Sequence, residues 1–134
     1  MTDTPPGRAY TGQDITVYYD IERCVHFAEC VRGLPEVFDT QRKPWITAGA
    51  ASADRVAEVV RRCPSGALHY LWSGPDEAPE SPTRIEATGW GPVTVRGDLR
   101  VAGPNGDTSA ETRVALCGCG RSAHAPRCDN TCRA

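Results

Sequence analysis

The sequence has no long apolar segment, no secretory leader and no excess of charge of one sign. Every apolar run is far shorter than the roughly 18 residues that a membrane-spanning helix needs, and residues 1–12 are polar and rich in Pro and Gly. The 15 basic and 17 acidic residues leave a formal net charge of -2, which offers no electrostatic basis for binding nucleic acid or an anionic membrane. These absences predict a cytoplasmic protein that binds neither.

Composition divides the 134 residues into four parts. Residues 1–13 are expected to form a flexible tail, and two blocks follow at 14–72 and 84–134. The linker between them, 73–83, holds three acidic residues and three prolines but no large apolar side chain, a composition typical of a solvated, semi-extended segment. The sequence therefore predicts two small domains.

Hydrophobic periodicity in the first block predicts two strands and one helix. Residues 15–19 alternate and are β-branched or aromatic, as strands are, and residues 67–72 are a second strand candidate. Residues 52–62 carry an apolar stripe at helical spacing, with Ser52 as N-cap, and Pro64 ends the helix.

The second block is expected to form short strands at 84–88, 93–96, 99–102 and 112–116. Gly97-Asp98 and Asn105-Gly106 predict tight turns between neighbouring strands. The segment after Cys117 has no periodicity, which indicates that a bound cofactor organises it. The two blocks together predict an α+β protein.

Cysteine is abundant, with seven residues in the chain, an odd number that cannot pair completely within one chain. Without an export signal the expected compartment is reducing, where clustered cysteines more often bind metals or act as redox centres than form disulfides. Metal binding is therefore the first hypothesis for both groups of cysteines.

The first group has the spacing C-x5-C at Cys24 and Cys30, followed much later by Cys63-Pro64. Bacterial ferredoxins hold a cubane cluster with closely spaced cysteines in one loop and a distant Cys-Pro. The block resembles single-cluster ferredoxins, and most closely their divergent branch. The segments that carry this resemblance are Cys30-Val-Arg-Gly-Leu-Pro-Glu-Val-Phe38, Lys43-Pro-Trp-Ile46 and Arg62-Cys-Pro-Ser-Gly-Ala-Leu68.

The resemblance implies a ferredoxin-like lobe over residues 14–72 that holds an iron–sulfur cluster on Cys24, Cys30 and Cys63. With three thiolates the cluster is either [3Fe-4S] or a [4Fe-4S] cluster whose fourth iron has a ligand other than cysteine. His26 is the nearest candidate for that ligand. In the alternative interpretation His26 packs beside the loop or donates a hydrogen bond to a sulfide.

The second group places four thiols within sixteen residues, at Cys117, Cys119, Cys128 and Cys132. Four thiolates suit tetrahedral zinc as well as iron. The spacing C-x-C-x8-C-x3-C differs from the paired C-x2-C of ordinary zinc ribbons, which weighs against zinc.

The order of C-x-C, Ser122, Pro126 and Cys128-Asp resembles the CDGSH iron–sulfur family. That resemblance implies a small β-rich lobe and a [2Fe-2S] cluster on Cys117, Cys119 and Cys128, with Cys132 at the position of the family's histidine. His124 is an alternative fourth ligand. Because a thiolate adds more negative charge than a neutral imidazole, Cys132 predicts a lower potential than histidine-ligated relatives have. Relatives often form dimers, so a homodimer stays open.

The sequence thus predicts an electron carrier with two iron–sulfur clusters and no substrate turnover of its own. The expected partner is a redox protein of the reductase or oxygenase class. Two alternatives remain: an iron–sulfur sensor or cluster-transfer protein, and a zinc-stabilised interaction module.

Overall fold

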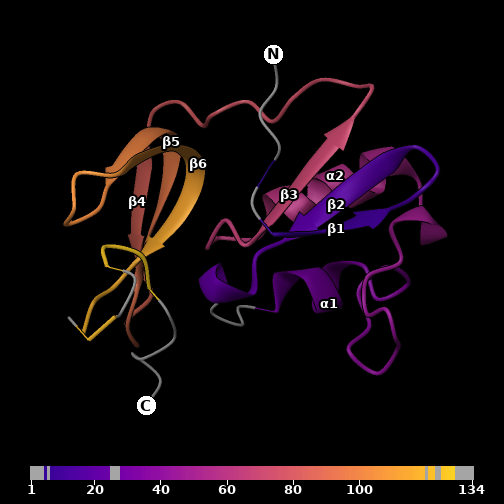
Figure 1. Cartoon of the computed structure of the whole chain (residues 1–134), viewed down its shortest axis with the longest axis horizontal. Coiled ribbons are helices and arrows are strands. Elements are labelled where there is room, and N and C mark those ends of the chain that lie inside the picture. Colours follow the sequence, from indigo (N-terminus) through magenta and orange to yellow (C-terminus); the bar gives the residue numbers. More distant parts are fainter. Residues whose placement is uncertain (1–4, 6, 25–27, 120, 123–124, 129–134) are drawn as a thin grey trace. The chain divides into compact units, whose positions relative to one another are not determined.

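The computed structural model describes residues 5, 7–24, 28–119, 121–122 and 125–128, and the structural statements that follow concern these residues. Two separate three-stranded antiparallel sheets and a few short helices make up this part of the chain (Figure 1). The α+β class is confirmed, whereas the ferredoxin-like arrangement stays a prediction. None of the described helices is long and apolar enough to cross a membrane.

The first sheet has the order β1-β2-β3, formed by Arg8–Thr11, Ile15–Tyr19 and Leu68–Trp72. The two strands predicted from periodicity are confirmed as β2 and β3, which pair antiparallel with Val17 opposite Tyr70. Ile15 and Val17 are buried, as the alternation of β2 requires. Residues 8–11 were expected to belong to a flexible tail, but they form β1. Their backbone pairs with the edge of β2, which would otherwise be open.

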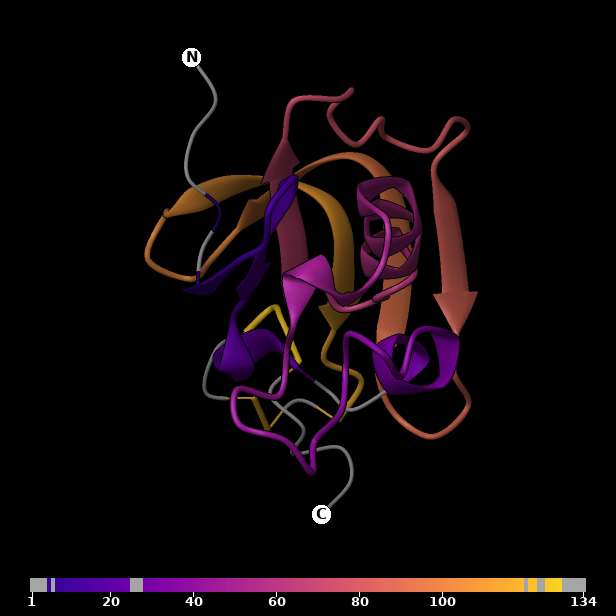
Figure 2. The same ribbon diagram turned by 90° about the vertical axis from the view of Figure 1, so that its right-hand side faces the viewer.

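Helix α2, Ala53–Arg61, packs on this sheet through its contact with β3 and closes the core (Figure 2). The Ser52 hydroxyl accepts a hydrogen bond from the backbone N–H of Arg55 at 3.3 Å, which confirms the predicted N-cap. The buried face of the helix carries Val56, Val59 and Val60, as the stripe predicted. Three short helical segments complete this part, namely η1 (Ile21–Arg23), α1 (Glu29–Gly33) and η2 (Ala48–Ala50).

The second sheet has the order β4-β5-β6, with β4 at Arg84–Ala87, β5 at Val93–Ala102 and β6 at Thr108–Leu116. The predicted turn at Asn105-Gly106 is confirmed, because Gly106 has φ of 87° and the β5–β6 hairpin closes with Gly103 N–H donating to Asp107 O at 2.7 Å.

The turn predicted at Gly97-Asp98 is wrong, and the strands predicted on either side of it are one strand, β5. Arg96 pairs with Arg113 and Leu99 with Glu111, so β5 carries one residue more than β6 between these pairs. The extra residue makes a β-bulge, which bends a strand without ending it. Glycine and aspartate are common to turns and bulges, and only the pairing with β6 distinguishes the two.

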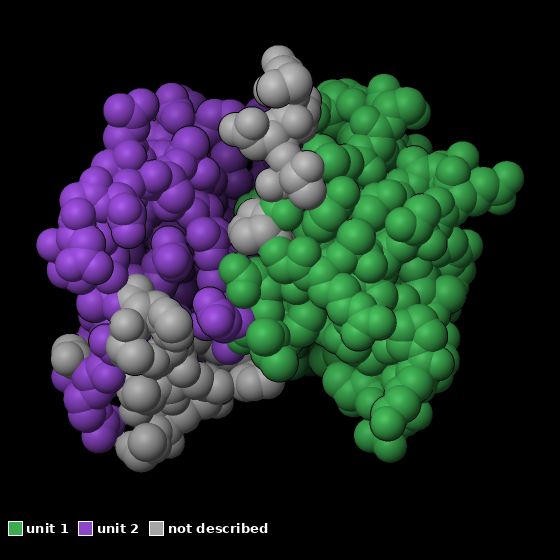
Figure 3. All heavy atoms as spheres, in the orientation of Figure 1, with its two compact units in different colours: residues 1–21, 27–63, 67–76 green, residues 22–26, 64–66, 77–134 purple. Residues whose placement is uncertain are grey.

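The chain divides into two compact units that are interleaved in sequence (Figure 3). Unit 1 contains Met1–Ile21, Phe27–Cys63 and Ala67–Asp76. Unit 2 contains Glu22–His26, Pro64–Gly66 and Glu77–Ala134. Two short segments of the N-terminal half thus belong to the unit built on β4-β5-β6.

Candidate metal centres

The three cysteines of the first group lie at the ends of short helical segments. Cys24 follows η1, Cys30 is in the first turn of α1, and Cys63 follows the last residues of α2. All three are half-buried, and Cys30 and Cys63 pack against the hydrophobic core of unit 1. The Cys63 N–H donates to Val60 O at 3.1 Å, so the end of α2 sets the position of this thiol.

Helix α1, which contains Cys30, packs closely on α2, the helix that ends just before Cys63. Arg55 donates from Nη2 to the carbonyl oxygen of Gly33 at 3.1 Å. A Cβ added to Gly33 would lie 3.3 Å from Cγ1 of Val59, so the absence of a side chain lets the α1 backbone lie close to the side chains of α2. The segment between Cys24 and Cys30 ends at Ala28, whose φ of 64° is rare for a residue other than glycine.

The charges beside Cys63 are engaged in surface pairs on α2. Arg62 donates from Nη2 to Glu58 Oε1 at 2.7 Å, and this hydrogen bond lowers the pKa of Glu58. Both side chains are well exposed, so the pair contributes little to stability.

In the second group, the Sγ atoms of Cys117 and Cys119 lie 3.6 Å apart. Two thiolates bound to one tetrahedral metal at about 2.3 Å would be about 3.8 Å apart, so this pair fits the coordination of one iron or zinc ion. Gly118 separates the two cysteines, and a Cβ there would overlap the carbonyl oxygen of Gly91. The glycine therefore lets the C-x-C turn lie against the segment that precedes β5.

A short ladder brings Cys128 beside the end of β6. Leu116 forms an antiparallel bridge with Arg127, and Cys128 N–H donates to Ala115 O at 2.8 Å while Cys117 N–H donates to Pro126 O at 2.8 Å. Because side chains alternate along a strand, Cys117 and Cys128 point to the same side of this ladder. Ser122 Oγ donates to the carbonyl oxygen of Arg127 at 2.5 Å and holds the loop closed.

The described residues therefore bring two thiols of the second predicted site, Cys117 and Cys119, close together. None of the six cysteines in the described part of the chain forms a disulfide bond. No group of three or more described His, Cys, Asp or Glu side chains is close enough to hold one metal ion, whereas the thiols of Cys117 and Cys119 lie 3.6 Å apart. His26, His124 and Cys132 lie outside the described residues, so the complete ligand sets stay predictions.

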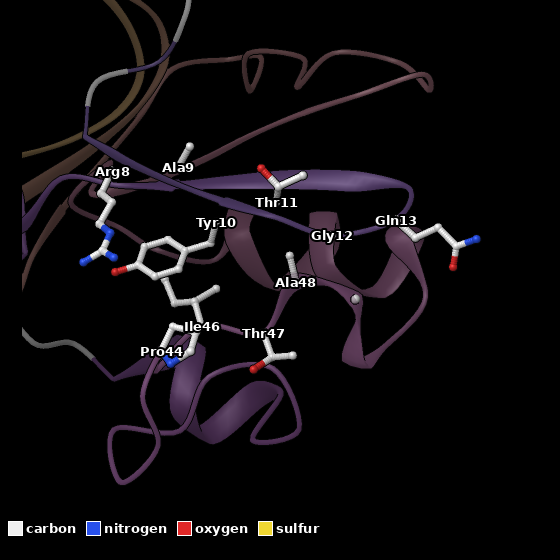
Figure 4. Close-up of a pocket in the computed structure, with 11 residues that line it drawn as sticks. Arg8, Ala9, Tyr10, Thr11, Gly12, Gln13, Pro44, Ile46, Thr47 and Ala48 are labelled. Carbon is white, nitrogen blue, oxygen red and sulfur yellow. The ribbon is translucent and has the colours of Figure 1, made fainter.

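A cavity of about 550 Å³ lies elsewhere in unit 1, between β1 and η2 (Figure 4). Arg8, Tyr10, Ile46, Thr47 and Ala48 are among the residues that line it, and none of the lining residues is a cysteine, histidine or acid. The cavity is therefore not a metal site.

Several charged residues that the sequence analysis did not single out are buried in unit 2. Arg23 and Arg113 each form an ion pair with a glutamate distant in sequence, and the side chain of Arg113 is fully buried. The signal available in the sequence was the alternation of Glu111 and Arg113, which places both on one face of β6. The periodicity of residues along β6 does not show whether other residues of unit 2 cover this face of the strand.

Comparison with known proteins agrees with the two resemblances seen in the sequence. Residues 10–73 match the family model described as divergent 4Fe-4S mono-cluster, and residues 90–132 match the one described as iron-binding zinc finger CDGSH type. Proteins named uncharacterized protein YjdI, from Escherichia coli strain K12 and Escherichia coli O157:H7, are each 44% identical to this chain over 63 residues. That match covers 47% of this chain and 83% of each relative. No solved structure matches the chain.

Proposed function

Because the chain belongs to the divergent 4Fe-4S mono-cluster family and continues into a CDGSH-type iron-binding domain, we propose that it carries two iron–sulfur clusters and transfers single electrons. The observation that carries the proposal is the thiol pair of Cys117 and Cys119, whose separation of 3.6 Å suits two ligands of one metal. The partner is a reductase or an oxygenase, and this chain turns over no substrate of its own.

The chain's own contribution is to hold the clusters and to set their potentials. A bound iron–sulfur cluster supplies the one-electron chemistry, and its potential depends on ligand type, hydrogen bonds to sulfur and exposure to solvent. Cys128 is 2% exposed whereas Cys119 is exposed. One end of the C-terminal site is therefore buried, and the other is at the surface, where a partner protein can approach it.

The two sites differ in the nature of the proposed cluster. Three cysteines in the first site, Cys24, Cys30 and Cys63, suit [3Fe-4S], or [4Fe-4S] with His26 as a fourth ligand. Four cysteines in the second site suit [2Fe-2S] with thiolate ligands only. The chain is proposed to work in the cytoplasm, as a monomer or a homodimer.

Anaerobic purification followed by iron and acid-labile sulfide analysis tests this proposal. We expect brown protein with two distinct EPR signals, both of which return after repeated reduction and reoxidation with the iron retained. Loss of iron on mild oxidation, or its transfer to an apo-protein, would instead favour sensing or cluster delivery. Colourless protein that contains zinc and no sulfide would contradict an iron–sulfur function altogether.

Replacing Cys132 by histidine is expected to raise the reduction potential of the C-terminal cluster. Histidine ligands carry less negative charge than thiolates, and a histidine that protonates near its usual pKa of about 6.5 adds acid-induced release of the cluster. Redox titration and a pH series of the visible spectrum would measure both effects. An unchanged potential and unchanged acid lability would show that Cys132 is not a ligand.

A further inference from the structure

Two short segments of unit 2 come from the N-terminal half, and each adjoins a candidate ligand of the first cluster site (Figure 3). Glu22–His26 contains Cys24, and Pro64–Gly66 follows Cys63 directly. Both segments contact β6, the strand that leads to Cys117, the first through the side chain of Glu111 and the second through the backbone of Arg113.

The first contact is a buried ion pair. Arg23, the residue before Cys24, donates from Nη1 to Glu111 Oε1 at 2.8 Å, and the two side chains are 11% and 4% exposed. The second carboxylate oxygen of Glu111 accepts a hydrogen bond from Ser109 Oγ at 2.8 Å. Both oxygens are therefore bonded, so Glu111 is held in place on β6 and the guanidinium is directed to it.

The second contact is a close approach of two backbones. Gly66 has φ of 74°, and a Cβ at this position would lie 2.5 Å from the carbonyl oxygen of Arg113. Arg113 lies two residues after Glu111, and so on the same face of β6. Only glycine fits where the chain passes from Cys63 to β3.

From these contacts we propose that β6 is part of the scaffold of the N-terminal cluster site, with Arg23 and Glu111 as positioning residues for Cys24. The inference rests on the proposed function for the identity of the cluster. Its consequence is that the N-terminal cluster depends on a folded C-terminal lobe.

This dependence is particular to the present chain. The YjdI relatives align with the N-terminal domain over 83% of their length, which leaves too little chain for a domain as long as residues 90–132. Relatives of this length have no room for a strand equivalent to β6. Here the buried carboxylate of Glu111 joins the segment before Cys24 to β6.

The test compares Glu111→Gln with the matched control Glu86→Gln in the full-length protein. Glu111→Gln removes the buried charge with little change of shape, whereas Glu86 lies on β4 in a surface pair and is 60% exposed. Loss of a charge-assisted hydrogen bond is expected to make the EPR signal of the N-terminal cluster decay about tenfold faster in air. The signal of the C-terminal cluster should be unchanged, as should both signals in Glu86→Gln.

A second measurement does not depend on the cluster. Hydrogen exchange followed by peptide mass spectrometry should show about tenfold faster exchange of residues 21–24 in Glu111→Gln, with residues 29–33 unaffected. Arg23→Lys alone keeps a positive charge opposite Glu111 and should retain most of the protection. Ser109→Ala removes one hydrogen bond to Glu111 and should produce a smaller change of the same kind, so it replaces Glu111→Gln if that variant fails to fold.

Equal decay of the N-terminal signal in Glu111→Gln and Glu86→Gln would overturn the proposal, as would parallel loss of both clusters or unchanged exchange at residues 21–24. Absence of sulfide from the wild-type protein would contradict the proposed function alone, because the exchange measurement still decides whether β6 holds the segment before Cys24.

Discussion

Replacing Glu77 by glutamine is expected to lower the free energy of unfolding by about 3 kcal/mol or more. Glu77 accepts two hydrogen bonds from Arg113, from Nε to Oε2 at 2.8 Å and from Nη2 to Oε1 at 3.0 Å. The side chain of Arg113 is 0% exposed and that of Glu77 is 15% exposed. Removal of the carboxylate charge breaks an ion pair to a fully buried guanidinium, and breaking a buried ion pair is among the costliest single changes in a protein.

Urea denaturation of the two proteins would measure this effect as a shift of the midpoint at constant m value. Glu80→Gln is the matched control, because Glu80 lies in the same linker but is 35% exposed and pairs with Arg84, whose side chain is 59% exposed. Its expected effect is below about 1 kcal/mol. A double variant, Glu77→Gln with Arg113→Met, should recover much of the lost stability because the buried positive charge is removed together with the carboxylate. Equal effects of the two glutamate substitutions would contradict the assigned role of the buried pair.

Replacing Cys119 by alanine is expected to abolish the C-terminal cluster while the N-terminal cluster remains. The thiol pair of Cys117 and Cys119 suits one metal ion, and the alanine variant leaves that ion one thiolate short. The loop from Cys117 to Cys128 is held by a few hydrogen bonds and contains little apolar surface, so it has little to replace the ligand bonds. In such a segment the free energy of metal binding stabilises the fold. The stability of the segment should therefore fall by several kcal/mol, on the order of half the roughly 10 kcal/mol that a small structural metal site contributes.

Iron content per chain and the EPR signal of each cluster would measure this result. Arg121→Ala is the matched control, since Arg121 lies in the same loop and is exposed. It should retain the iron of both sites. A Cys119→Ala protein with full iron content and an unchanged C-terminal signal would exclude Cys119 as a ligand.

The elements with short-range signals were predicted correctly. Ser52 as an N-cap, the valine stripe of α2 and the alternation of β2 all lie within a few residues, and the structure confirms each of them. The turn at Asn105-Gly106 is similarly local. Gly97-Asp98 was predicted wrongly because a turn and a bulge have the same composition, and the pairing of β5 with β6 decides between them.

The linker illustrates a different limit. Its acidic residues and prolines predict a solvated segment, and most of it has no regular structure. Glu77 nevertheless lies against Arg113, which is 36 positions away in the sequence. No property of the linker distinguishes Glu77, which is 15% exposed and paired with the buried Arg113, from Glu80, which is 35% exposed and paired with Arg84.

The amino-acid sequence alone was enough to identify the chemistry, because the spacing of cysteines and the segments around them identify two families whose models the chain matches. The tertiary structure decides which charged residues form pairs, and no local pattern predicts them. Arg23 pairs with Glu111, which is 88 positions away, and Glu77 of the linker pairs with Arg113. A helix or a turn depends on neighbours within a few residues, whereas a buried ion pair depends on the path of the whole chain. For that reason the sequence predicts which cysteines are ligands, whereas only the tertiary structure shows that Arg23, next to Cys24, is paired with Glu111 of β6.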